Sequence, residues 1–140
     1  MDAARAQGMI FGVALIMTLL GHLARQQQNY SQAKARYREG LMILSAFDSP
    51  TYAAWCLEGY AAALCAEEYY AQATRLCAAA VALREKVQTP LPPIEREEFE
   101  QIIATTKVAL DEQAFVCEWA AGAALLQDEA IDYALSDACA

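Results

Sequence analysis

Apolar residues recur along this chain at spacings of three and four almost from end to end. That spacing brings them onto one face of an α-helix, whereas a half-buried strand alternates every second residue. No stretch of the chain alternates convincingly. The sequence therefore predicts an all-α fold of about seven helices, at residues 3–26, 31–46, 51–67, 70–87, 94–110, 111–122 and 127–135.

The interruptions between these segments carry residues that end or begin helices. Gln27-Gln-Asn29 is a polar turn, and Pro50 cannot continue a helix because its ring removes a donor and restricts the residue before it. The strongest interruption is Thr89–Pro93. After it, Ile94–Glu98 supplies the acidic first turn that complements a helix dipole. The pattern therefore predicts helices joined by short loops.

A pattern of small residues repeats between the first and the second pair of predicted helices, 40 residues apart. In a helix-turn-helix repeat, such positions lie where the two antiparallel helices of a pair touch, so bulk is excluded there. The matching positions are Gly21 and Ala61, Ala33 and Ala73, Tyr37 and Cys77, and Gly40 and Ala80.

At these positions the chain resembles the tetratricopeptide repeat. The second unit, residues 51–88, has Cys77 where a larger residue is usual. The resemblance implies antiparallel helical hairpins stacked as a right-handed α-solenoid, with residues 94–138 as C-terminal capping helices of a single domain, 1–140. The first unit, residues 9–47, is the better match, at Leu20-Gly21, Ala33, Tyr37 and Gly40.

Five longer motifs follow one another in the second half of the chain: Cys56–Ala61, Ala73–Glu85, Pro90–Arg96, Glu118–Gly122 and Asp128–Leu135. Together they are similar to the tetratricopeptide-like C-terminal sensor region of bacterial, ATPase-containing transcriptional regulators of the LuxR and MalT type. The resemblance implies a module for signalling and transcription regulation that binds a protein partner or a small-molecule effector.

The chain departs from these regulators in two ways. It contains no P-loop and no DNA-binding helix-turn-helix segment, so it can carry neither their ATPase nor their DNA-binding function. In addition, Leu126 and Gln127 stand where a Ser or Thr helix cap is usual. We therefore expect the last helix to be poorly capped, at a cost of about 1 kcal/mol.

The net charge of −8 is distributed unevenly. Five basic and two acidic residues give residues 1–47 a charge of +3, and five basic against sixteen acidic residues give the remainder −11. Because an acidic body repels phosphate backbones, we expect no direct binding of nucleic acid. The basic stretch Lys34–Arg38 is expected to be a solvated helix face.

The five cysteines form no Cys-x-x-Cys pair, and their odd number argues against a secreted disulfide framework. A reducing, cytoplasmic setting is the natural interpretation. Cys139, next to the end of the chain, is predicted to be exposed and reactive. The others are expected to act as small buried hydrophobes in the core, at Cys56, Cys65, Cys77 and Cys117.

The apolar stretch Met9–Leu20 has three interpretations: a signal peptide, a membrane helix or a buried first helix. It is too short to span a bilayer, and no small-x-small cleavage site follows it. Asp2 also offsets Arg5, so the positive flank of a signal peptide is missing. We therefore expect a buried first helix and no membrane association.

Few residues suggest chemistry. The only histidine, His22, has no Cys or Ser at a credible helical spacing, so we expect a packing or surface role for it. The acidic pairs lie at helix ends, where electrostatic capping is expected. The sequence therefore predicts no catalytic residue, no metal ligand and no cofactor, and hence no enzyme.

Partner-binding residues are sought on the concave surface of the stacked hairpins, which the first helix of each pair lines. Tyr52 and Trp55 lie near the start of such a helix and are our candidates. The main functional hypothesis is a non-catalytic protein- or ligand-binding module. The alternative is a self-associating module that forms a homodimer, because two repeats are fewer than the three or so that independent stability usually needs.

Overall fold

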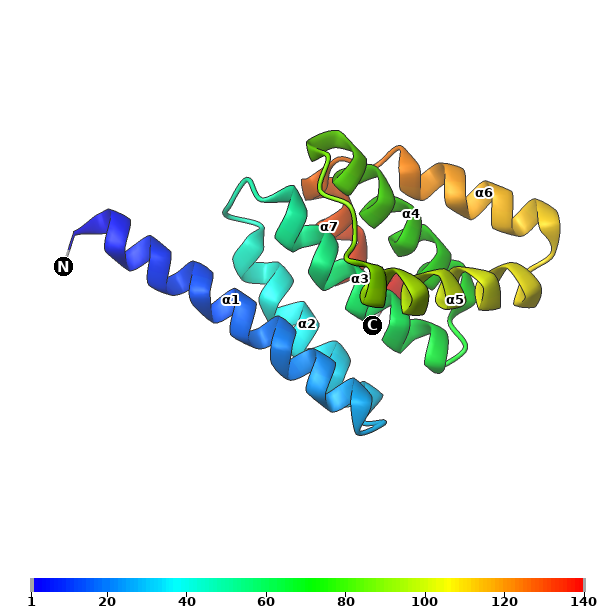
Figure 1. Cartoon of the computed structure of the whole chain (residues 1–140), viewed down its shortest axis with the longest axis horizontal. Helices are drawn as coiled ribbons and strands as arrows, with labels where there is room; N and C mark the ends of the chain where they lie inside the picture. The colour runs from blue at the N-terminus through cyan, green and yellow to red at the C-terminus, as the bar shows by residue number, and fades with distance from the viewer. Residues whose placement is uncertain (1, 140) are drawn as a thin grey trace.

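The computed structural model describes residues 2–139, and within that range it is helical and contains no strand. The predicted all-α class and the predicted number of helices are confirmed, and nearly all helix ends lie within two residues of the expected positions. The elements are α1 (Ala3–Gln26), α2 (Tyr30–Leu44), α3 (Pro50–Ala66), α4 (Tyr70–Val87), α5 (Pro93–Ala109), α6 (Glu112–Ala123), α7 (Gln127–Leu135) and the 3-10 turn η1 (Asp137–Cys139), as Figure 1 shows.

Local side-chain chemistry sets most of the helix starts. Asp2, Asn29 and Asp111 each accept a hydrogen bond from the backbone N–H three residues later, at 2.8, 3.2 and 2.7 Å. Such bonds satisfy donors that the first turn of a helix leaves free. Pro50 and Pro93 occupy the first position of their helices, where a missing N–H costs nothing.

The first four helices form two antiparallel hairpins that lie side by side. In the first hairpin α1 packs against α2, and in the second α3 packs against α4. The two hairpins meet where α2 packs against α3. Helix α5 crosses both α3 and α4, and α7 packs back against α2, α3 and α4. The two hairpins are repeat-like, but α6 lies along α4 and barely contacts α5. Gly122 permits this approach, because a Cβ there would collide with the carbonyl oxygen of Arg75.

Tyr37 on α2 is the contact that joins the two hairpins. Its ring is fully buried between two glycines: a Cβ added to Gly21 on α1 would lie 2.6 Å from the ring, and one added to Gly59 on α3 would lie 2.5 Å from it. Only glycine allows the ring to fit on both sides. The structure buries every position of the small-residue repeat, namely Gly21, Ala33, Tyr37, Gly40, Ala61, Ala73, Cys77 and Ala80.

The first helix is far more exposed than we expected. Only Ala14, Thr18, Gly21 and Ala24 of α1 are buried, and seven large apolar side chains along it are exposed. The reason is that α2 and α3 contact one face only, and the N-terminal part of α1 projects beyond both (Figure 1). Among the described helices, α1 alone is long and apolar enough to cross a membrane by length and composition; 17% of its most apolar window is buried.

Two of the cysteine predictions are wrong. Cys139 is fully buried, because the chain end folds back as η1 and the Tyr60 hydroxyl donates a hydrogen bond to the Cys139 carbonyl oxygen at 2.6 Å. Cys117, expected in the core, is exposed on α6. Cys56 and Cys77 are buried as predicted, whereas Cys65 on α3 is partly exposed.

The basic stretch on α2 is not a solvated face either. Lys34 forms an ion pair with Glu67 at 2.7 Å. The Arg38 guanidinium donates hydrogen bonds to the carbonyl oxygens of Ala134 and Leu135, at 3.1 and 2.8 Å. These carbonyls lie at the end of α7 and lack partners within that helix. Arg38 is therefore a structural cap that ties α7 to α2.

The start of α7 is capped in an unusual way. Leu126 provides no side-chain acceptor, as expected, but its backbone N–H donates to the Glu129 carboxylate at 2.9 Å. The Gln127 amide accepts a bond from the Ser49 N–H at 3.1 Å and donates one to the Phe47 carbonyl at 2.7 Å. These two bonds hold α7 against the loop between α2 and α3.

We predict that Gly59→Ala destabilises the protein by about 1–3 kcal/mol, because the added methyl group overlaps the Tyr37 ring. Gly8→Ala is the control: a Cβ there meets nothing within 4 Å, so the change should raise helix stability by up to about 1 kcal/mol. Urea unfolding followed by circular dichroism measures both. Equal effects of the two changes on stability would contradict the close contact between Gly59 and the Tyr37 ring.

We also predict that one thiol reacts much faster than the others in the folded protein. Burial raises the pKa of Cys56 to about 12 and that of Cys139 to about 11, so neither forms a thiolate readily. A short pulse of iodoacetamide should therefore modify Cys117, as peptide mass spectrometry would show. The Cys117→Ser variant should lose the fast reaction, and rapid labelling of Cys139 would disprove its burial.

Candidate functional site

A cleft of about 350 Å³ lies where the C-terminal half of α1, the middle of α3 and the N-terminal half of α5 meet. We call it the α1–α3–α5 cleft. The first helix of each hairpin contributes one wall, and α5 contributes the third. The residues that shape it most are Leu19, His22 and Arg25 from α1, Trp55, Glu58, Gly59 and Ala62 from α3, Leu91 from the connection, and Glu95, Glu98, Phe99 and Ile102 from α5.

His22 lines the cleft and is held by Tyr37. The two side chains meet at 2.6 Å, from His22 Nδ1 to the Tyr37 hydroxyl, and Arg25 Nε donates to the same hydroxyl at 3.3 Å. Arg25 can only donate to this hydroxyl, and the arrangement in which the hydroxyl in turn donates to His22 Nδ1 uses its proton in a bond and puts the imidazole proton on Nε2. Within residues 2–139, Nε2 has no hydrogen-bond partner, so it is available as a donor.

The charge state of His22 follows from its surroundings. The pKa of His22 is lowered from 6.5 to about 4; burial is the largest cause, the nearby Arg25 cation adds to it, and the Glu98 carboxylate opposes both. Burial also raises the pKa of Tyr37 to about 12. At neutral pH both groups are therefore uncharged, and they form a fixed pair of hydrogen-bonding groups at one end of the cleft.

An ion pair bridges α1 and α5 at the cleft. Arg25 Nη1 lies 2.5 Å from Glu98 Oε1, with the Arg25 side chain 20% exposed and that of Glu98 55% exposed. A pair that is half in solvent contributes at most about 1 kcal/mol. It can therefore open at little cost when another charged group approaches.

A second ion pair is buried behind the cleft. Glu58 and Arg84 meet through two bonds, of 2.5 and 2.9 Å, and Arg84 also donates to the Thr89 carbonyl at 3.0 Å. Burial raises the pKa of Glu58 and the Arg84 cation opposes this shift.

Glu58 also borders a second groove of about 590 Å³ on the other side of α5, whose apolar lining includes Val81, Leu91, Phe99, Ile103 and Trp119.

The cleft has an excess of negative charge. Its lining holds one cation, Arg25, and three carboxylates, those of Glu58, Glu95 and Glu98. When the buried partner Arg84 is included, two cations face three anions, which leaves −1. Glu95 accounts for this excess, because it takes part in no ion pair within the described residues.

The two candidate partner-binding residues lie near each other, but only one lines the cleft. Trp55 does so, with its ring edge-on to His22 at a centroid distance of 5.1 Å. Tyr52 is 40% exposed and lies beside Phe11, at 5.4 Å, outside the cleft lining. The two rings are 6.3 Å apart.

Sequence reasoning missed most of the other cleft residues. Arg25 and Glu98 are 73 positions apart, and no local pattern indicates that they meet. Glu58 did leave a signal, since it is the only charged residue in the 17 residues of α3. A lone carboxylate in an apolar helix needs a buried partner or a functional role. His22 has the packing role that was expected, and it also lines the cleft.

The cleft combines an apolar lining with a few polar groups. Among residues 2–139, no group of three His, Cys, Asp or Glu side chains is arranged to hold a metal ion. The hydroxyl nearest to His22 belongs to Tyr37, whose raised pKa keeps it protonated. The cleft thus offers an aromatic and aliphatic floor, a neutral N–H donor and an unpaired carboxylate.

Comparison with known proteins does not place this chain in a family. No family model, no curated protein and no solved structure matches it. The resemblances to the tetratricopeptide repeat and to the LuxR and MalT regulators therefore stay predictions. The function has to be inferred from the chemistry of the cleft itself.

We predict that lowering the pH from 7 to 5 destabilises the protein by about 1–2 kcal/mol through His22 alone. The pKa of His22 is about 4 in the fold and about 6.5 in the unfolded chain. Between pH 6.5 and pH 4 the unfolded chain binds more protons at His22 than the folded chain does. The stability that neutral His22 contributes is therefore fully present above pH 6.5 and is lost as the pH falls toward 4. His22→Gln keeps an acceptor for Tyr37 but cannot titrate.

The measurement is the midpoint of urea unfolding at both pH values. The variant should lose less stability than the wild-type protein between pH 7 and 5, because all other titrating groups are common to both. Identical losses would show that His22 is not held neutral by the fold.

Proposed function

We propose that this chain is a non-catalytic helical-repeat module that binds a peptide segment of a partner protein in the α1–α3–α5 cleft. The segment carries a basic side chain next to an apolar one. One observation carries this proposal: the cleft combines an aromatic floor with the Glu95 carboxylate, which forms no ion pair with any cation of residues 2–139.

The apolar part of the cleft supports an inserted side chain. Trp55 and Phe99 line it from different helices, and Leu91 and Ile102 complete the apolar lining. Aromatic residues in desolvated pockets contribute most of the affinity at protein interfaces. A volume of about 350 Å³ suits one or two side chains of a peptide, and it is too small to hold a folded surface.

The charge of the cleft supports a basic neighbour of that side chain. Glu95 lies in the exposed first turn of α5, and Glu98 is bound to Arg25 only through a half-exposed pair. A lysine or arginine of the peptide would pair with Glu95 directly. The net charge of −8 would also steer cations toward this surface. The Nε2–H of His22 would serve as a donor for a peptide carbonyl.

We assign this module to the sensor or interaction part of a bacterial, cytoplasmic signalling or transcription-regulatory system. Two lines of support exist. The five motifs of the second half are similar to the sensor region of LuxR and MalT-type regulators. The two adjacent hairpins, in which α1 contacts α3 and α3 contacts α5, are compatible with a tetratricopeptide-type solenoid whose first helices line the binding surface.

The test is selection of peptides on the purified chain. Random twelve-residue peptides are displayed, and the selected ones are measured by fluorescence anisotropy. We expect enrichment of Lys or Arg beside a large apolar residue. Trp55→Ala should weaken binding about tenfold or more, because it removes the aromatic floor. Glu95→Lys should weaken it as well, because it reverses the unpaired charge.

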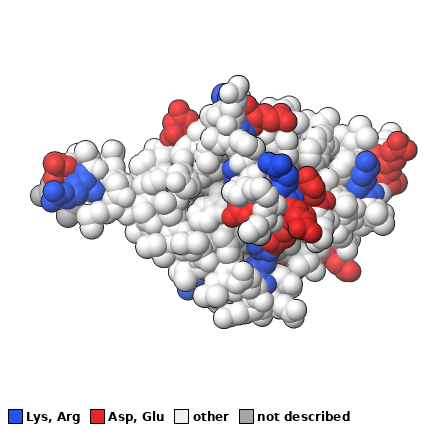
Figure 2. Space-filling model, viewed as in Figure 1, with Lys and Arg blue, Asp and Glu red and all other residues white. Residues whose placement is uncertain are grey.

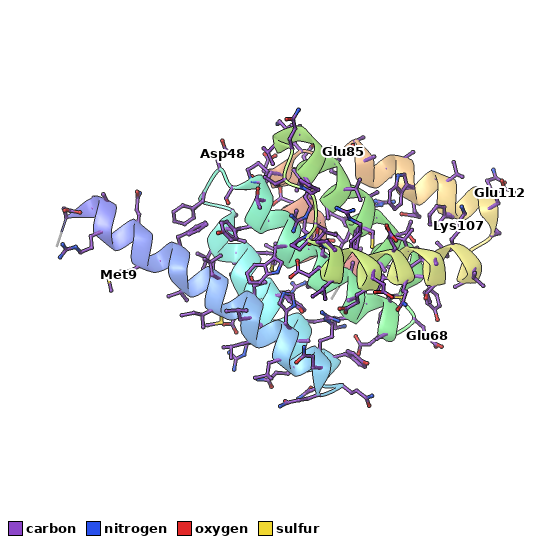
Figure 3. All side chains as sticks on the ribbon, in the orientation of Figure 1. Met9, Asp48, Glu68, Glu85, Lys107 and Glu112 are labelled. Carbon is purple, nitrogen blue, oxygen red and sulfur yellow. The ribbon has the colours of Figure 1, made fainter. Side chains whose placement is uncertain are left out.

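The matched control is Glu68→Lys. It makes the same charge change at the turn between α3 and α4, outside the cleft lining, and Figure 3 labels its position. Affinity should be nearly unchanged in this variant. Selection of acidic peptides, or equal affinity for all three variants and the wild-type protein, would refute the proposed function.

A further inference from the structure

The exposed face of α1 carries a regular apolar stripe. Its members recur at spacings of three and four, and five of them expose between 37% and 59% of their surface. No Lys, Arg, Asp or Glu lies between Arg5 and Arg25, so this part of α1 is uncharged in Figure 2. In Figure 3 the labelled Met9 side chain points away from the rest of the molecule. The stripe consists of Ala6, Met9, Val13, Ile16, Leu20 and Leu23.

We propose that this stripe is the interface with a second copy of the chain, in which the two α1 helices pack antiparallel about a two-fold axis. The inference goes beyond peptide binding, because the stripe is separate from the cleft. It turns the general expectation of self-association into a specific surface with a specific orientation.

The spacing of the stripe is symmetric. From Ala6 to Leu23 the steps are three, four, three, four and three residues, which read the same in both directions. This is the seam of a coiled coil, where apolar residues repeat on average every 3.5 residues. In an antiparallel pair, Val13 then lies opposite Ile16 of the second copy, and Met9 opposite its Leu20. Ala6, the smallest member, lies opposite Leu23.

The exposed apolar area makes up most of what a dimer interface needs. Together with the flanking Ile10, the stripe exposes apolar surface on the order of 600 Å², at the upper limit of what a soluble monomer leaves uncovered. A stable interface buries roughly 800 Å² on each partner. A helix of 24 residues is about 36 Å long, which is enough for five turns or more of contact.

The N-terminal part of α1 provides a second reason. Residues 2–5 and 7–10 are exposed, so this part of the helix has almost no packing against its own chain. It also contains Gly8 and Gly12, and a Cβ at either would meet nothing within 4 Å. Each glycine lowers helix stability by roughly 1 kcal/mol, and a short helix without packing is only marginally stable. Packing against a second copy supplies the missing stabilisation.

A lipid bilayer is the competing occupant, since α1 is apolar and long enough to span one. The opposite face of α1 argues against it. His22 is bonded to Tyr37, Arg25 is paired with Glu98, and Gly40 of α2 lies close to the Ala14 carbonyl oxygen, at 3.3 Å from a Cβ added there. Entry of α1 into a bilayer would break all three contacts and expose α2, with its charged residues, to lipid.

The first experiment is sedimentation equilibrium of the whole chain at increasing concentration. We expect a reversible monomer–dimer equilibrium. Ile16→Asp places a charge at the centre of the stripe and should weaken the dimer by a hundredfold or more. The matched control, Ile94→Asp, makes the same change at an 87% exposed isoleucine of α5 and should leave the dimer intact. Circular dichroism verifies that both variants are folded.

The second experiment tests the orientation. A photo-crosslinking amino acid at position 23 should attach to residues around Ala6 of the second copy, as peptide mass spectrometry would show. Attachment around Leu23 of the second copy would mean a parallel pair and would overturn the proposed arrangement. A wild-type chain that is monomeric at every concentration would overturn the proposal altogether.

Phosphatidylcholine vesicles provide the last arm. The dimer would be refuted if the wild-type chain cosedimented with vesicles and formed no dimer in solution. If Ile16→Asp then lost vesicle binding and Ile94→Asp kept it, the stripe would be a lipid-binding surface. None of these outcomes depends on peptide binding in the cleft, so the two proposals can fail separately.

Discussion

The fold and the cleft both depend on one aromatic ring. Tyr37 is pressed between Gly21 of α1 and Gly59 of α3, and neither contact leaves room for a side chain. The ring sets how closely the two hairpins approach. Because His22 follows Gly21 and Glu58 precedes Gly59, the same contact places two polar residues of the cleft. The Tyr37 hydroxyl also binds His22 and Arg25. Core packing and site geometry therefore cannot vary independently here.

The third wall of the cleft is attached by different forces. Only Phe99 and Thr106 of α5 are buried, so this helix has a small share in the core. The segment that connects α4 to α5 is held by Arg84, which donates a hydrogen bond to the Thr89 carbonyl oxygen. Glu58 in turn fixes the Arg84 side chain. The remaining link is the half-exposed pair of Arg25 and Glu98. Helix α5 is held by Phe99, Thr106, the partly buried Ile102 and Ile103 and one weak ion pair, so it can adjust to a ligand more easily than α1 and α3, which close packing around Tyr37 fixes.

The features that the sequence predicted well are those that neighbouring residues decide. Helix ends follow from caps and prolines, which act within one or two turns of the chain. The errors concern what covers a given face. The exposure of α1 and of Cys117, the burial of Cys139 and the capping role of Arg38 all depend on contacts between distant segments. Arg38, for example, binds a carbonyl 97 positions away. Periodicity shows that a helix has an apolar face, but it does not show whether anything covers that face.

The two proposed surfaces are compatible because α1 uses different sides for them. At about 100° per residue, Arg25 lies about 180° around the helix from Ile16, and His22 lies about 120° from it. An antiparallel pair of α1 helices would therefore cover the stripe and leave both clefts open. The two-fold axis would place two clefts on one rigid scaffold, each with its own unpaired Glu95. A partner that carries two basic segments at the matching separation would then bind more tightly than either segment alone, because the second contact forms within the same complex.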